Sequence, residues 1–154
     1  MKKNIGISIF VLFIAIGALH AFSIHFYFYW IFWWLDIPMH FLGGLFAGLV
    51  GLWTYLYSGV FSYDKQGRFR LVFAAVIGAL VIGGFWEVYE YFTGQTYNAI
   101  RNYPLDVLKD MVFDVLGGFV AAFYVEKGLK KETRGPINSW QNQSQSTTED
   151  KPLK

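Results

Sequence analysis

Residues 37–57 read IPMHFLGGLFAGLVGLWTYLY, an apolar run that contains no Asp, Glu, Lys or Arg and one histidine, His40. A helix needs about 20 such residues to cross the hydrocarbon core of a bilayer. Three further apolar segments of comparable length occupy residues 5–22, 71–92 and 105–125. The sequence therefore predicts an all-α, polytopic membrane protein built as a bundle of four transmembrane helices.

The composition agrees with that class and excludes several others. The chain has 154 residues, of which 55% are hydrophobic, 21% aromatic and 16% charged, and its net charge is +2. A disordered protein has few aromatic residues and a large net charge. The lack of cysteine excludes disulfide scaffolds and thiolate metal sites. Because the basic residues lie between apolar stretches and no glycine loop for phosphates is present, we expect membrane lipids as partners, and neither nucleic acid nor nucleotide.

Basic residues predict the orientation of the four helices. They alternate by loop, and those on one side are Lys2, Lys3, Lys65, Arg68, Arg70, Lys127, Lys130, Lys131 and Arg134. The connections on the other side hold only Arg101. Cytoplasmic loops carry the excess of Lys and Arg, so we expect a protein of the cytoplasmic membrane with both termini inside. A rival interpretation takes the start as a signal peptide, although Leu19 stands where cleavage prefers a small residue.

Two segments outside the four helices have distinct compositions. Residues 23–35 are rich in Phe, Tyr and Trp, which favour the headgroup level, so we expect an aromatic interfacial segment between the first two helices. A re-entrant lid over a site is the alternative. Residues 132–154 are polar and predict a disordered cytoplasmic tail, which leaves residues 1–131 as the transmembrane domain.

Polar side chains gather at the predicted outer ends of three helices. They are Asp36 and His40 on the second, Glu87 and Glu90 on the third, and Asp106, Asp110 and Asp114 on the fourth. Spacings of three and four residues place each set on one helix face. Small residues continue the same faces inward, among them Gly44, Gly83 and Gly118, and they allow close helix packing. Asp36, which precedes Ile37 and Pro38, also fits an ordinary helix N-cap.

Such a cluster cannot be fully ionised without compensation. One solution is a divalent cation, and oxygen-rich ligation with one nitrogen suits Mg²⁺, Mn²⁺, Fe²⁺ or Zn²⁺. A second solution is a set of shared protons that forms a proton or ion pathway. A third is a structural network with Lys109 and Arg101.

Three sequence blocks carry a resemblance to a known family. They are residues 36–44 (DIPMHFLGG), residues 86–90 (WEVYE), and residues 106–117 with the pattern D-x3-D-M-x2-D-x2-G. In these blocks the chain resembles the YjdF-like family of small integral membrane proteins and, more distantly, VanZ-like proteins. It departs from the pattern at Val107, where relatives often have Thr. The resemblance implies the same membrane fold and the same seven polar positions, and it implies no settled activity.

Two functional hypotheses follow. In the first, the protein is a metal-dependent enzyme that acts on a lipid or lipid-linked substrate. Its general base is Glu90, and its candidate metal ligands are Asp36, His40, Glu87, Asp106, Asp110 and Asp114. In the second, the protein is a non-enzymatic membrane module whose polar cluster is structural or conducts an ion. The sequence shows no Ser-His-Asp set that would support covalent catalysis.

Overall fold

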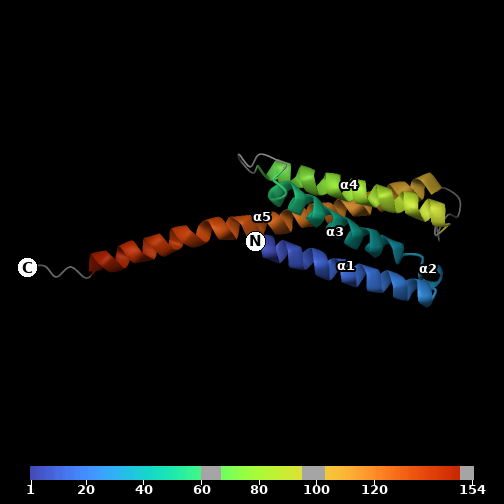
Figure 1. Ribbon diagram of the computed structural model, residues 1–154, viewed down its shortest axis with the longest axis horizontal. Coiled ribbons are helices and arrows are strands. Elements are labelled where there is room, and N and C mark those ends of the chain that lie inside the picture. Colours follow the sequence, from blue (N-terminus) through green and yellow to red (C-terminus); the bar gives the residue numbers. More distant parts are fainter. Residues whose placement is uncertain (60–66, 95–102, 150–154) are drawn as a thin grey trace, which may run out of the picture.

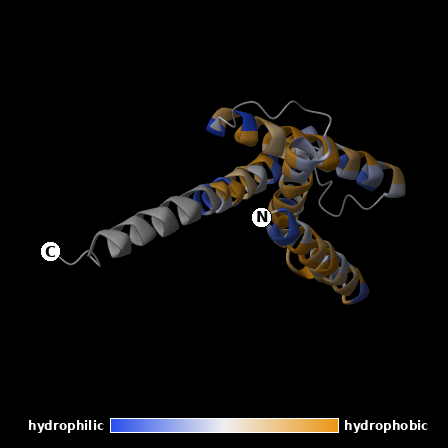
Figure 2. Cartoon of the chain, turned by 60° about the vertical axis from the view of Figure 1, so that its left-hand side comes forward, coloured by the Kyte–Doolittle hydropathy of each residue, from blue (hydrophilic) through white to orange (hydrophobic). Residues whose placement is uncertain are grey.

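The computed structural model describes residues 1–59, 67–94 and 103–149, with side chains up to residue 131, and every regular element in these ranges is a helix. The helices are α1 (Lys2–His25), α2 (Phe28–Ile31), α3 (Asp36–Tyr57), α4 (Arg68–Thr93) and α5 (Tyr103–Glu149). Three of them, α1, α3 and α4, are long and apolar enough to cross a membrane. Figure 2 shows hydrophobic residues along the packed helices and hydrophilic residues near their ends.

The long helices pack side by side, with α3 in the middle (Figure 1). Helix α3 contacts α1, α4 and α5, and α4 also contacts α5. Residues buried between α3, α4 and α5, together with Ile5 of α1, form the apolar core; they are Ile5, Leu49, Leu52, Leu56, Leu71, Ala75, Ala121, Ala122 and Val125. Met1 lies against Gly128, so the N-terminus sits beside the middle of α5. The polar cluster lies at the opposite end of the bundle from this core.

Glycine permits the close approach of α3, α4 and α5. A Cβ added at Gly48 would lie 2.9 Å from the Cα of Gly118, and one added at Gly51 would lie 2.6 Å from the carbonyl oxygen of Ala74. Any side chain at these positions would push the backbones apart. A Cβ at Gly6 on α1 would meet nothing within 4 Å. The predicted packing seam is therefore confirmed, and α1 lies at its periphery.

The observed helices α1, α4 and α5 extend the predicted ones at both ends, whereas α3 begins one residue earlier and ends at Tyr57 as predicted. The predicted ranges 5–22, 37–57 and 71–92 fall inside α1, α3 and α4, and 105–125 falls inside α5. Helix α5 carries Asp106, Lys109, Asp110 and Asp114 in its first turns, and it is not among the three helices that meet the membrane criterion. It also continues to Glu149, through most of the range predicted to be a disordered tail. A helix bonds its backbone internally, so a polar sequence can continue it beyond the packed bundle.

The aromatic connection folds back at the end of α1. Tyr27 adopts a left-handed conformation with φ of 58°, and this turn leads into the single-turn helix α2. Tyr29 is buried, whereas Trp30, Trp33 and Trp34 are exposed. Exposed indole rings agree with a segment that lies at an interface, and its position in a membrane stays a prediction.

Candidate metal centre

His40 is the centre of the polar cluster. It lies one turn into α3, its side chain is 4% exposed, and its ring faces carboxylates from three helices. Its Nε2 atom is 3.5 Å from Asp36 Oδ1, 3.7 Å from Glu87 Oε1 and 3.9 Å from Asp110 Oδ2. These separations exceed ordinary hydrogen bonds, and ligand atoms of His40, Glu87 and Asp110 all lie within 4.8 Å of one another.

The other face of the same imidazole meets a fourth carboxylate. Asp114 Oδ2 lies 3.4 Å from His40 Nδ1, and Asp114 is 2% exposed. Glycine makes room for Asp114 on both sides, because its backbone packs against Gly44 and its carboxylate packs against Gly83. The packing seam and the polar cluster are thus one structure. Asp114 orients the ring that presents Nε2 to the other three carboxylates.

Two buried carboxylate oxygens have no hydrogen-bond partner within the described part of the chain. They are Glu87 Oε1 and Asp110 Oδ1. Glu87 is 6% exposed and Asp110 is 3% exposed. Asp110 Oδ1 does lie 3.2 Å from Lys109 Nζ, at an angle that allows an ion pair and no hydrogen bond. Buried polar atoms without donors are costly, so this end of the bundle calls for a cation or a proton.

Lys109 neutralises the outer edge of the cluster. Its Nζ atom lies 2.7 Å from Asp106 Oδ1, 3.2 Å from Asp110 Oδ1 and 3.3 Å from Asp36 Oδ2. Asp106 is turned to this lysine and is more exposed than Asp110. Arg101, the other predicted counter-ion, lies outside the described residues.

Asp36 begins α3 and does not cap it. The N-cap is Leu35, and no side chain accepts a capping hydrogen bond there. The capping interpretation of Asp36 is therefore wrong. Its carboxylate instead faces His40 and Lys109, because residues four apart lie on one helix face. Pro38 in the first turn costs no helical hydrogen bond.

Glu90 is held at the rim of the cluster by a tryptophan. Trp86 Nε1 donates a hydrogen bond of 2.8 Å to Glu90 Oε1. Ligand atoms of Asp36, His40 and Glu90 all lie within 4.8 Å of one another. The same limit holds for His40, Glu87 and Asp110, and for Asp36, Asp106 and Asp110. The structure therefore brings together all seven predicted positions.

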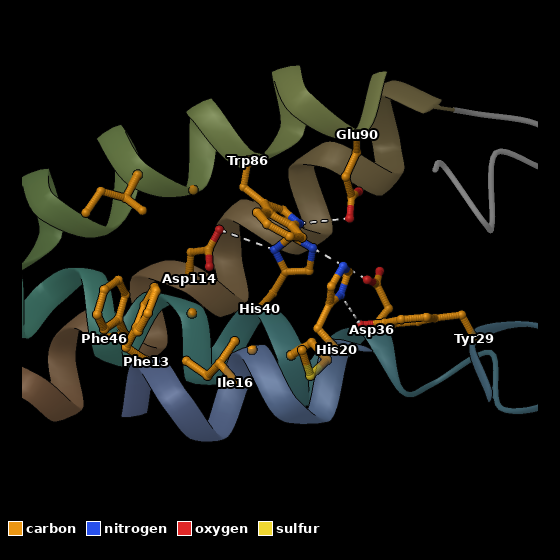
Figure 3. A pocket seen from close by; sticks show the side chains of 15 residues that line it. Phe13, Ile16, His20, Tyr29, Asp36, His40, Phe46, Trp86, Glu90 and Asp114 are labelled. Carbon is orange, nitrogen blue, oxygen red and sulfur yellow. Dashed lines mark hydrogen bonds and ion pairs between the residues drawn. The ribbon is translucent and has the colours of Figure 1, made fainter. Parts of the chain in front are cut away.

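A cavity of about 340 Å³ opens beside this cluster (Figure 3). Its polar wall holds Asp36, His40, Glu90 and Asp114, and its other walls are mostly apolar. His20 of α1 also lines it, a residue that the sequence analysis did not include in the site. Its Nδ1 atom is 2.9 Å from the Tyr29 hydroxyl, and its ring stacks edge-on against Trp86 at 5.2 Å. Only the outer position of His20 on the first helix, level with the acidic residues, pointed to this placement.

Comparison with known families identifies the family to which the chain belongs. Residues 3–131 match the model of a family described as "Predicted membrane protein (DUF2238)". The chain belongs to this family. No curated protein and no solved structure matches it. Membership in DUF2238 establishes a membrane protein, and the polar cluster gives this DUF2238 protein its candidate site.

Proposed function

We propose that this DUF2238 protein spans the cytoplasmic membrane four times and binds a divalent cation between α3, α4 and α5 near the outer surface. Residues 105–125 of α5 would form the fourth span, because α5 packs along both α3 and α4. Lys2 lies over the ring of Tyr57, at the end of α3 far from His40, and Arg68 and Lys130 both pair with Glu126, which supports cytoplasmic termini. We retain the YjdF-like resemblance as an interpretation of the same three sequence blocks.

The arrangement around His40 Nε2 carries the proposal of a metal. Around an ion with ligands at about 2.1 Å, neighbouring ligand atoms lie roughly 3.0–3.4 Å apart and opposite ones about 4.2 Å apart. The distances of 3.7 and 3.9 Å from Nε2 to the oxygens of Glu87 and Asp110 fall between these limits. The ligands would be His40, Glu87 and Asp110, whose ligand atoms all lie within 4.8 Å of one another, and the buried Glu87 Oε1 would gain the partner that it lacks among the described residues.

Asp114 and Asp106 would act differently from these three ligands. Asp114 contacts the opposite ring nitrogen, as the orienting carboxylate of a metal-bound histidine does. Asp106 is paired with Lys109, which would hold the outer edge of the site. One nitrogen with several carboxylate oxygens suits Mg²⁺, Mn²⁺, Fe²⁺ or Zn²⁺.

The reaction that best fits this site is hydrolysis of a lipid or lipid-linked substrate. A bound divalent ion activates water and polarises the bond to be cleaved. Glu90 would accept the proton of that water; the hydrogen bond from Trp86 to its carboxylate, at the rim where the cavity meets the cluster, supports this role. The cavity gives a substrate access to the same rim.

One observation favours a second candidate function. Lys109 lies within 3.3 Å of three carboxylates, so part of the negative charge is balanced without a metal. In that case the cluster would be a structural lock between α3 and α5, or a pathway for protons. Metal content separates the two functions.

The test compares two aspartates one turn apart on α5. Asp110→Asn removes a proposed ligand, whereas Asp106→Asn makes the same chemical change at a residue that faces Lys109. We expect wild type to retain about one divalent ion per chain, and Asp110→Asn and His40→Ala to weaken retention by at least about 100-fold. Asp106→Asn should stay close to wild type. Elemental analysis and melting in detergent, with and without chelator, give the result. If wild type contains no stoichiometric metal and chelator leaves its melting temperature unchanged, the metal centre is refuted and the second candidate function stands.

A further inference from the structure

The cavity beside the cluster is amphipathic. Its polar residues lie on one side, where His40, Glu90 and Asp114 face it. Its remaining wall includes Phe13 and Ile16 of α1, Phe46 of α3 and Ile82 of α4, as Figure 3 partly shows. From His20 to Phe13 the wall follows about 10 Å of helix α1 at ~1.5 Å per residue. The hollow is therefore elongated along the helices, with its polar contacts at the outer end.

The cavity reaches the lipid-facing surface between α1 and α4. Phe13 and Trp86 both line it, and they are 60% and 37% exposed. Helix α1 packs along α3 and meets α4 at the ring contact of His20 with Trp86. Towards the outer end, the hydrogen-bonded pair His20–Tyr29 and the indole of Trp86 stand side by side. The outer end of the cavity is thus lined by aromatic rings, whereas Phe13 is exposed at its side.

The charges of the lining residues restrict the headgroup. The wall contains the carboxylates of Asp36, Glu90 and Asp114, and none of its described residues is Lys or Arg. The six carboxylates of the cluster outnumber the positive charges of Lys109 and one divalent ion, so an anionic head would meet net negative charge, which disfavours binding. An uncharged head with hydroxyl groups would find carboxylate acceptors within reach.

We propose that this cavity binds the hydrocarbon chain of a membrane lipid with an uncharged head, entering sideways between α1 and α4, and holds the head against Glu90. The proposal rests on the proposed hydrolytic function, for which it names the substrate class. Apolar pockets of a few hundred Å³ with a few convergent polar groups are typical of small-ligand sites. The elongated apolar wall matches a chain, and the polar end matches a head.

Glycine supplies a matched pair of variants. Gly17 lines the cavity, and a Cβ there would meet nothing within 4 Å, so Gly17→Leu fills space without a backbone clash. Gly6 lies on the same helix, also has open space around it and is not among the residues that line the cavity. Gly6→Leu is therefore the control. Ile82→Phe, on the opposite wall, is a second filling variant.

The experiment uses a monoacylglycerol that carries a photoreactive diazirine in its chain, added to the full-length protein in phosphatidylcholine vesicles. We expect cross-links to concentrate on peptides with Phe13, Ile16 or Phe46, and to fall about tenfold in Gly17→Leu and Ile82→Phe but not in Gly6→Leu. The corresponding photoreactive fatty acid should label these peptides less than the monoacylglycerol does. Labelling spread over all exposed helix faces, or unaffected by both filling variants, would overturn the proposal, as would stronger labelling by the fatty acid.

Metal content of the same samples separates this proposal from the proposed function. Labelling confined to the cavity in a protein that binds no divalent ion would uphold the chain site and refute the metal centre. If the protein binds a stoichiometric ion but the cross-linking is the same in wild type, Gly17→Leu and Ile82→Phe, the binding site for the chain is refuted and the metal centre is supported.

Discussion

Adjacent glycines on α4 provide a sharp test of the link between packing and the polar centre. A Cβ added at Gly83 would lie 2.9 Å from the Cγ of Asp114 and would contact its Oδ2 atom. A Cβ added at Gly84, on the neighbouring face of the same helix, would meet nothing within 4 Å. We expect Gly83→Ala to destabilise the protein and Gly84→Ala to stabilise it.

The magnitude follows from what must move. Both substitutions remove a helical glycine, which favours the helix by about 1 kcal/mol. The Asp114 carboxylate lies 3.4 Å from His40 Nδ1, and the new methyl group at Gly83 forces it away from that nitrogen. The rest of Asp114 cannot shift to compensate, because its backbone is already packed against Gly44. Losing a hydrogen bond to a charged group costs about 1.5–3 kcal/mol, and overpacking costs about 1–3 kcal/mol. The two variants should therefore differ by about 2.5–6 kcal/mol in unfolding free energy.

Unfolding in mixed micelles, titrated with a denaturing detergent, measures this difference. The same pair should be compared in an Asp114→Ala background, where the carboxylate that obstructs the new methyl group is gone. There the penalty at Gly83 should largely disappear, which gives a coupling energy between the two positions. Equal stability of Gly83→Ala and Gly84→Ala in the parent protein, within about 0.5 kcal/mol, would refute the reasoning.

Three further predictions concern the seam, the lysine and the topology. Gly118→Leu should lower the melting temperature in detergent far more than Gly6→Leu, because only Gly118 faces a neighbouring backbone and side chain within 3.2 Å; equal effects would remove the case for a shared seam. Lys109→Met should destabilise chelator-treated protein by about 1–3 kcal/mol, since Lys109 is partly exposed, and millimolar Mg²⁺ should restore part of the loss in melting experiments; an unchanged melting temperature in chelator would show that the ion pairs contribute nothing. A reporter after Arg134 should lie in the cytoplasm and one near Asn98 outside, and a cytoplasmic signal at Asn98 would contradict the placement of the site.

Much of the fold could be predicted from length and spacing alone. Apolar runs of membrane length correspond to α1, α3 and α4, and the glycines on α3, α4 and α5 mark their contacts. The extent of α5 could not be predicted this way. Apolar periodicity ends near Val125, but a helix needs no apolar face to continue into water.

The sequence predicted which residues form the candidate site, but it did not predict the role of each residue. Spacings of three and four residues put each acid on a shared face, and the structure confirms that these faces meet. The sequence cannot say which ring nitrogen of His40 faces Asp114, because that depends on how far α3 and α5 are rotated about their axes. His20 was missed as a lining residue for a similar reason. Helix α1 carries no polar stripe, and its rotation is fixed only by contacts with Tyr29 and Trp86.

The charged first turns of α5 have a consequence for how the protein is made. In the four-span topology, Asp110 and Asp114 would enter the bilayer on a helix that is too polar to partition from the translocon into lipid alone, since each buried acid opposes insertion by up to about 3 kcal/mol. Insertion of α5 would then require that α3 and α4 are already inserted beside the translocon. His40 and the glycine faces of these two helices would contact α5 as it enters the bilayer. A nascent chain that stalls before α5 docks would leave His40 exposed to lipid without Asp110 and Asp114. The proteases and chaperones of the membrane would then recognise the misassembled chain by the exposed His40, the residue at the centre of the polar cluster in the folded protein.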